Sequence, residues 1–107
     1  MSTKPKDKEL AQQFADRLRE RLGDNLVAVT LFGSRARGTA GEGSDFDFIV
    51  QVIQKSEAVS EAVLDVEVEM MNEFEALFAA IIYSTDEWAF TKQTPLGWNV
   101  ADEGISL

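Results

Sequence analysis

Two aspartates, Asp45 and Asp47, are the residues of this sequence best placed to do chemistry. They open the segment 45–52, which alternates and is rich in β-formers, so it predicts a strand. Alternate side chains share one face of a strand, which places these carboxylates roughly 6.6 Å apart on the same side. Adjacent carboxylates repel each other unless a cation lies between them. Mg2+ is the expected cation, because it takes oxygen ligands and fills its shell with waters and substrate phosphates.

A glycine and a serine, Gly33 and Ser34, supply the other half of the pattern. They follow the apolar run 26–32, which predicts a central, covered strand. A glycine at the end of a strand lets the backbone approach a ligand closely, and a helix beginning at Ser34 would aim free N–H groups at an anion. The sequence therefore predicts a site for phosphate and metal between two strands.

These residues carry a resemblance to a known family. The motif Gly33-Ser34-Arg35-Ala36-Arg37-Gly38, followed by Ser44-Asp45-Phe46-Asp47, resembles the GSxARG and SDxD signature of the polymerase-beta-like nucleotidyltransferase superfamily. The short chain is most similar to its minimal nucleotidyltransferases, which are often encoded beside a HEPN protein as the antitoxin to its toxin. The resemblance implies an α+β fold, with a small mixed β-sheet flanked by helices.

The resemblance also implies a role for each matching residue. Gly33 and Ser34 match residues that hold the triphosphate of a nucleotide. Ser44 is also expected to contribute to nucleotide binding. Asp45 and Asp47 match the catalytic, metal-binding carboxylates. The alternative is a strand edge with two solvated aspartates beside a glycine-rich surface turn.

Arg35 and Arg37 have two interpretations. Their guanidinium groups could clamp phosphate, which arginine binds with paired hydrogen bonds. They could equally be exposed cations on the first turn of a helix. The sequence leaves both interpretations open.

One expected residue is missing. Active members of the superfamily generally carry a third carboxylate on the strand after the intervening helix, where it ligates the metal and helps activate the attacking hydroxyl. The matching position falls near Ala79, which is not acidic. Asp65, Glu67 and Glu69 could replace it only if the segment 64–70 were a strand.

Composition narrows the possible chemistry. The 107 residues predict a single domain over 1–107, with no apolar stretch long enough to span a membrane. The chain has no histidine or cysteine, which excludes catalytic triads, thiolate chemistry and histidine-bound zinc. The net charge of −9 argues against direct nucleic-acid binding. The N-terminus lacks the apolar core of a signal peptide, so we expect a cytoplasmic protein.

The periodicity of apolar residues predicts the remaining elements. The segment 56–75 fits a helix over its whole length, with Ser56 or Ser60 near its start, but 64–70 also alternates like a strand. The complete prediction is a helix over 7–22, strands over 26–32, 45–53 and 77–83, a loop over 38–43, a helix over 56–75, a helix opening at 85–88, and a last helix from Pro95 to Gly104.

Two hypotheses about function follow. The first is metal-dependent transfer of a nucleotide, AMP from ATP, to a hydroxyl of a HEPN-type partner protein. The second is a partner-masking subunit whose nucleotide site has no transferase activity. In a chain of this size part of the apolar surface, including Trp88 or Trp98, is expected on a patch for self-association or for the partner. The alternative is that both tryptophans close the core.

Overall fold

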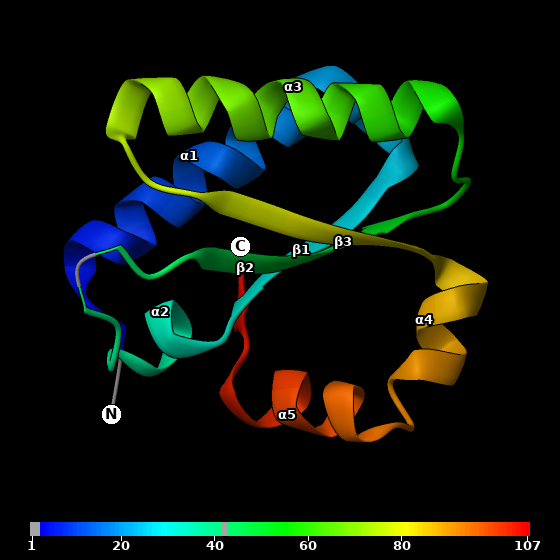
Figure 1. Ribbon diagram of the computed structural model, residues 1–107. Coiled ribbons are helices and arrows are strands. Elements are labelled where there is room, and N and C mark those ends of the chain that lie inside the picture. The colour runs from blue at the N-terminus through cyan, green and yellow to red at the C-terminus, as the bar shows by residue number, and fades with distance from the viewer. Residues whose placement is uncertain (1–2, 42) are drawn as a thin grey trace.

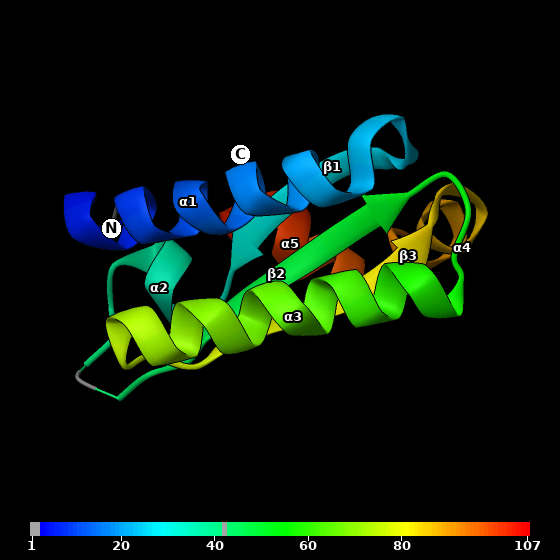
Figure 2. The same cartoon turned by 90° about the horizontal axis from the view of Figure 1, so that it is seen from above.

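The protein folds into a four-stranded sheet with helices on both faces (Figure 1). The computed structural model describes residues 3–41 and 43–107. Helices α1 and α3 lie side by side over one face of the sheet (Figure 2), and α2, α4 and α5 lie on the other side. The elements are α1 (Pro5–Leu22), η1 (Gly23–Asn25), β1 (Leu26–Phe32), α2 (Ser34–Arg37), β2 (Phe46–Val52), α3 (Glu57–Phe74), β3 (Phe78–Ser84), α4 (Thr85–Thr91), α5 (Pro95–Glu103) and β4 (Ile105–Ser106).

The sheet is mixed and has the strand order β3-β2-β1-β4. Strand β1 pairs antiparallel with β2 and with the short β4, whereas β2 and β3 run parallel. A parallel pair needs a crossover, which α3 provides. The predicted α+β fold with a small mixed sheet is confirmed.

The core lies between the sheet and the pair α1 and α3. Phe46 and Phe48 of β2 are completely buried on this face. The ring of Phe48 stacks on Phe14 of α1 at 4.2 Å, and Phe46 stacks on Phe78 of β3 at 4.5 Å. Because alternate residues of β2 face opposite sides, this packing directs Asp47 to the other face of the sheet.

The ambiguous segment is a helix. Val59, Val63, Val66 and Met70 of α3 are buried, at the spacing of one helical face. The side chain of Ser56 accepts a hydrogen bond from the Val59 N–H at 3.2 Å and so caps the helix. The strand alternative for 64–70 is therefore wrong, because the helical spacing of apolar residues extends over the whole segment 57–74, whereas the alternation is confined to seven residues.

Other boundaries differ slightly from the prediction. Strand β2 begins at Phe46, so Asp45 lies directly before it. The loop predicted over 38–43 joins α2 to β2, and Glu42 within it lies outside the described residues. Within the described residues, no helix combines the length and apolar character needed to cross a membrane.

Candidate functional site

Gly33 forms the turn between β1 and α2. Its φ of 80° is in a region that side chains other than glycine rarely adopt. A Cβ atom at this position would lie 2.9 Å from Oδ2 of Asp47, so the backbone of Gly33 rests against that carboxylate. The Ala36 and Arg37 N–H groups donate to the Gly33 carbonyl, at 3.0 and 3.1 Å, and start the short helix α2. The structure thus brings the glycine turn and Asp47 together.

Asp47 lies on the sheet face opposite the core, and Asp45 directly precedes its strand β2. Asp47 is aligned with Phe32 of β1 and with Ala79 of β3. Burial raises the pKa of Asp47, and the negative charge of Asp45 raises that pKa further. Asp45 is therefore close enough for its charge to act on Asp47.

This donor set fits a hard divalent cation. A cation between Asp45 and Asp47 would relieve their repulsion and offset the burial of Asp47. The described residues contain no group of three acidic, histidine or cysteine side chains that could hold a metal ion. An ion such as Mg2+ would thus need waters or substrate oxygens to complete its shell.

The position opposite Asp47 holds a methyl group. Ala79 occupies the place on β3 where the family resemblance predicts the third carboxylate. Glu67 accepts a hydrogen bond from the backbone N–H of Ala80 at 3.1 Å. Burial raises the pKa of Glu67, and that hydrogen bond lowers it in part. Glu69 forms ion pairs with Arg17 and Arg21 of α1, and Asp65 is exposed on α3.

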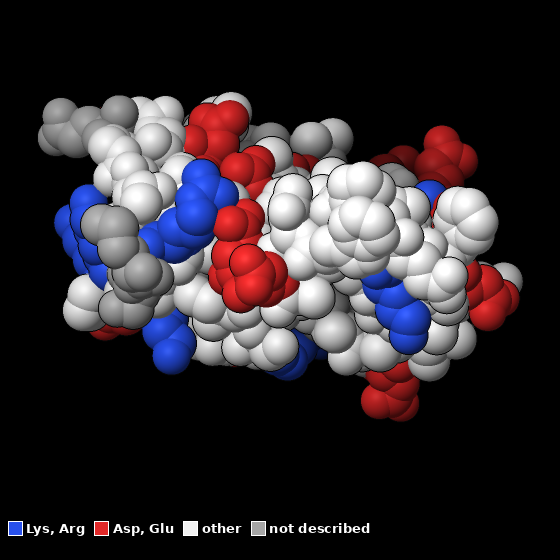
Figure 3. Space-filling view, turned by 90° about the horizontal axis from the view of Figure 1, so that it is seen from below, with Lys and Arg blue, Asp and Glu red and all other residues white. Residues whose placement is uncertain are grey.

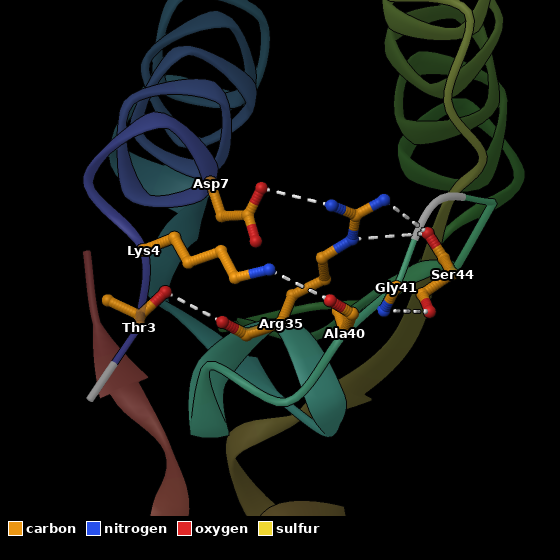
Figure 4. A network of polar contacts seen from close by, with 7 residues as sticks. All are labelled: Thr3, Lys4, Asp7, Arg35, Ala40, Gly41 and Ser44. Atoms are coloured by element: carbon orange, nitrogen blue, oxygen red, sulfur yellow. Dashed lines mark hydrogen bonds and ion pairs between the residues drawn. The ribbon is translucent and has the colours of Figure 1, made fainter. Parts of the chain in front are cut away.

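Arg35 is held inside the fold by a polar network (Figure 4). Its Nε and Nη2 atoms donate to the carbonyl oxygen of Ser44 at 3.2 and 2.8 Å, and Nη1 donates to Oδ1 of Asp7 at 3.0 Å. The guanidinium carbon also lies 4.4 Å from the ring centre of Phe46. The side chain of Arg35 is only 14% exposed, so its interpretation as an exposed cation is wrong.

The start of α1 supports the same loop. The hydroxyl of Thr3 donates to the carbonyl of Arg35 at 2.6 Å, and Nζ of Lys4 donates to the carbonyl of Ala40 at 3.0 Å. The hydroxyl of Ser44 accepts the N–H of Gly41 at 3.2 Å. Figure 4 shows these contacts converging from α1 and from both sides of the loop. The loop that ends at Ser44 is therefore fixed just before Asp45.

Arg37 has a different partner. Its Nη1 atom lies 3.0 and 2.9 Å from the two carboxylate oxygens of Glu103, at the end of α5. The N–H of Gly33 donates to Oε1 of the same carboxylate at 3.2 Å. A hollow of about 530 Å³ opens beside this pair, with Lys8 and Asp102 in its lining. Figure 3 shows acidic and basic side chains side by side toward the end of the molecule where α2 lies.

Sequence reasoning missed Asp7 and Glu103. Asp7 looks like an ordinary acid in the first turn of a helix, where the helix dipole favours it. Glu103 is 70 residues from Gly33, and no local pattern connects them. The charged neighbours of the motif become visible only once α1 and α5 are placed.

The sequence model of the nucleotidyltransferase domain matches residues 11–89. The chain belongs to the nucleotidyltransferase domain family. The match runs from α1 through the glycine turn and both aspartates into α4, so it includes every site residue predicted from the motif.

A curated relative extends over a shorter segment. It is a Methanocaldococcus jannaschii protein named as a protein adenylyltransferase, 44% identical over 41 residues. That alignment covers 38% of this chain and only 28% of the relative.

Solved structures share the fold of this nucleotidyltransferase domain. A variant of the MntA–HpeT toxin–antitoxin matches with a TM-score of 0.65 at 14% identity, covering 90% of this chain and 70% of that one. A toxin–antitoxin with AMP-PNP gives 0.62 at 16% identity, covering 89% and 70%. A Shewanella oneidensis complex of tri-AMPylated HEPN toxin with MNT antitoxin gives 0.60 at 13% identity, covering 94% and 70%.

Proposed function

We propose that this nucleotidyltransferase domain transfers AMP from Mg2+-bound ATP to a hydroxyl of a HEPN-type partner protein. The observation that carries the proposal is the contact between Gly33 and Asp47. The glycine turn, to which we assign the phosphates, lies against the carboxylate of Asp47, in a chain of the nucleotidyltransferase domain family. In phosphoryl and nucleotidyl transfer, charge neutralisation and positioning supply most of the catalysis.

Each site residue has an assigned task. Asp45 and Asp47 hold Mg2+, which when bound neutralises phosphate charge and orients the reacting groups. Gly33, Ser34 and Arg37 bind the phosphates of the nucleotide, and Ser44 lies at the near edge of the nucleotide site. Arg35 fixes the carbonyl of Ser44 and so the start of β2.

The comparisons support the choice of nucleotide and acceptor. The relative is named as a protein adenylyltransferase, one fold neighbour was solved with AMP-PNP, and another contains an AMPylated HEPN toxin. We assign ATP, AMP transfer and a HEPN partner to this chain on that basis.

The second candidate function is partner masking without transfer. Ala79 favours it, because it leaves the described residues with no third acidic ligand and no evident base at the site. Without the third metal ligand and the general base, transfer would be slower by several orders of magnitude unless the partner compensates. The chain would then neutralise its partner by covering its surface.

One experiment separates the two candidates. The purified chain is incubated with a HEPN-type protein, Mg2+ and ATP labelled on the α-phosphate. We expect label on the partner, and none with the Asp45→Asn and Asp47→Asn double variant. A stable complex without label would support masking. Undiminished labelling or Mg-ATP affinity in the double variant would remove both aspartates from the mechanism.

A further inference from the structure

The carboxylate of Glu103 occupies two donors of the glycine turn. Its Oε1 atom accepts the backbone N–H of Gly33 at 3.2 Å and lies 3.0 Å from Nη1 of Arg37. Its Oε2 atom lies 2.9 Å from the same Nη1. Gly33 and Arg37 are two of the groups to which the proposed function assigns the phosphates of the nucleotide.

A carboxylate and a phosphate compete for such donors. Both present charged oxygens that accept hydrogen bonds from N–H groups and pair with guanidinium. An incoming polyphosphate would meet the negative charge of Glu103 at the point where it needs positive groups. Triphosphate and Glu103 therefore cannot both use the N–H of Gly33 and the charge of Arg37 fully.

We propose that Glu103 is an internal competitor of the nucleotide. In the free protein its carboxylate occupies the phosphate-binding donors, and it leaves them when a triphosphate binds. This inference rests on the proposed function, because it concerns the same site. It adds that a residue of α5, outside the segment that matches the family, lowers the affinity for the nucleotide.

The exchange requires little movement of the backbone. The N–H of Gly104 donates to the carbonyl of Val100 at 2.7 Å and closes α5. Ile105 is paired with Leu31 of β1, which fixes the chain on the other side of Glu103. The adjacent hollow, which Glu103 itself lines, offers its side chain space to rotate away from both donors.

The test compares two neighbouring acids at the end of α5. Glu103→Gln keeps the size and an acceptor oxygen but removes the charge, and Asp102→Asn removes one charge from the lining of the same hollow. Isothermal titration calorimetry measures the dissociation constants of inorganic tripolyphosphate and Mg-ATP. We expect Glu103→Gln to bind both about threefold to tenfold more tightly, the scale of losing one ion pair and weakening a charge-assisted hydrogen bond to a neutral one. Asp102→Asn should change both constants less than twofold.

Three outcomes would overturn the inference. Unchanged or weaker binding by Glu103→Gln would show that Glu103 supports the turn and does not compete for it. Equal tightening by Asp102→Asn would show only a general effect of net charge. If neither the wild type nor Glu103→Gln binds tripolyphosphate or Mg-ATP, the proposed nucleotide site itself fails. Thermal unfolding of each variant establishes that it is folded.

Discussion

Gly33 and Asp47 constrain each other at the level of single atoms. In Gly33→Ala the new methyl carbon would lie 2.9 Å from Oδ2 of Asp47, which is too close for a relaxed contact. The substitution would also strain the backbone, because φ at this position is 80°. We expect a loss of about 1–3 kcal/mol in stability, together with weaker Mg-ATP binding. Urea unfolding and Mg-ATP titration measure the two effects.

Gly43 supplies the matched control for this variant. It has the same φ of 80°, but among the described residues no atom lies within 4 Å of a Cβ built there. Gly43→Ala should therefore lose stability through backbone strain and keep its affinity for Mg-ATP. Equal loss of affinity in both variants would mean that strain, and not the contact with Asp47, governs the site.

Asp47 carries a predictable pH dependence. Because burial and Asp45 raise its pKa in the folded state, the folded protein holds its proton more tightly than the unfolded chain. Stability contributed by this group thus falls as the pH rises from the unfolded pKa through the folded one. In metal-free buffer Asp47→Asn should be more stable than the wild type at pH 7, by about 0.5 kcal/mol, the scale of a partly exposed charge interaction.

The difference should vanish at acid pH. Below the ordinary pKa of aspartate the wild-type side chain is protonated in both states, so the two proteins should unfold at matching urea concentrations. A variant that is less stable at pH 7 would show that the charge of Asp47 is stabilised by a partner and not destabilised by burial and Asp45.

The sequence predicted the position of these residues and missed those that surround them. Alternation along 45–52 predicted the strand that carries Asp47 and the burial of Phe46 and Phe48 on its other face, because strand geometry is local. That Asp45 shares the face of Asp47 stays a prediction. Asp7 and Glu103 come from opposite parts of the chain and reach the motif only through the packing of α1 and α5. Their roles depend on tertiary contacts, which spacing does not encode.

At the scale of elements, the register between β2 and β3 decides where a third acid would have to stand. Ala79 is paired with Asp47, and both side chains face away from the core. Ala79→Asp should therefore add a carboxylate to the site and raise labelling of the partner about tenfold or more, since a well-placed base contributes at least that much. The labelling assay of the proposed function measures it.

Ile81 provides the control for register. It lies two residues further along β3, on the same face, and is 44% exposed, so Ile81→Asp should fold without helping the reaction. Equal rates for Ala79→Asp and the wild type would mean that the missing acid does not limit transfer. The partner would then supply the missing function, or no transfer would occur.

Element boundaries were predictable where one segment carried its own signal. The length of the apolar period and the cap at Ser56 identified α3 despite its alternating stretch. The two-residue strand β4 was not among the predicted elements, because a strand that short exists only through its pairing with β1. The position of the third carboxylate was predicted only as near Ala79, because the alignment of β3 with β2 depends on pairing between strands.

At the scale of the whole molecule, apolar groups remain on the surface. Trp98 is 62% exposed and Phe90 is 78% exposed, whereas Trp88 is partly buried and its ring lies 5.3 Å from that of Tyr83. The prediction that a tryptophan is exposed is confirmed, and its use by a partner stays a prediction. Figure 3 shows a broad uncharged area on the face below the sheet.

Fluorescence quenching tests whether a partner covers Trp98. Acrylamide is the suitable quencher, because the net charge of −9 would repel iodide. In the Trp88→Phe variant we expect strong quenching of Trp98 in the free chain and about half as much after the HEPN-type partner is added. Unchanged quenching in a proven complex would place the interface elsewhere.

The position of β3 at the end of the sheet has a consequence for handling the isolated protein. Its outer edge presents backbone groups, of which the N–H of Ala80 is covered by Glu67, and the segment 77–83 contains neither charge nor proline. Such edges promote aggregation through pairing of strands from different molecules. Repulsion between the negatively charged molecules opposes this aggregation. Salt shortens the range of that repulsion to about 3 Å at 1 M. Concentrated stocks should therefore stay clear at low ionic strength and become turbid as salt is added.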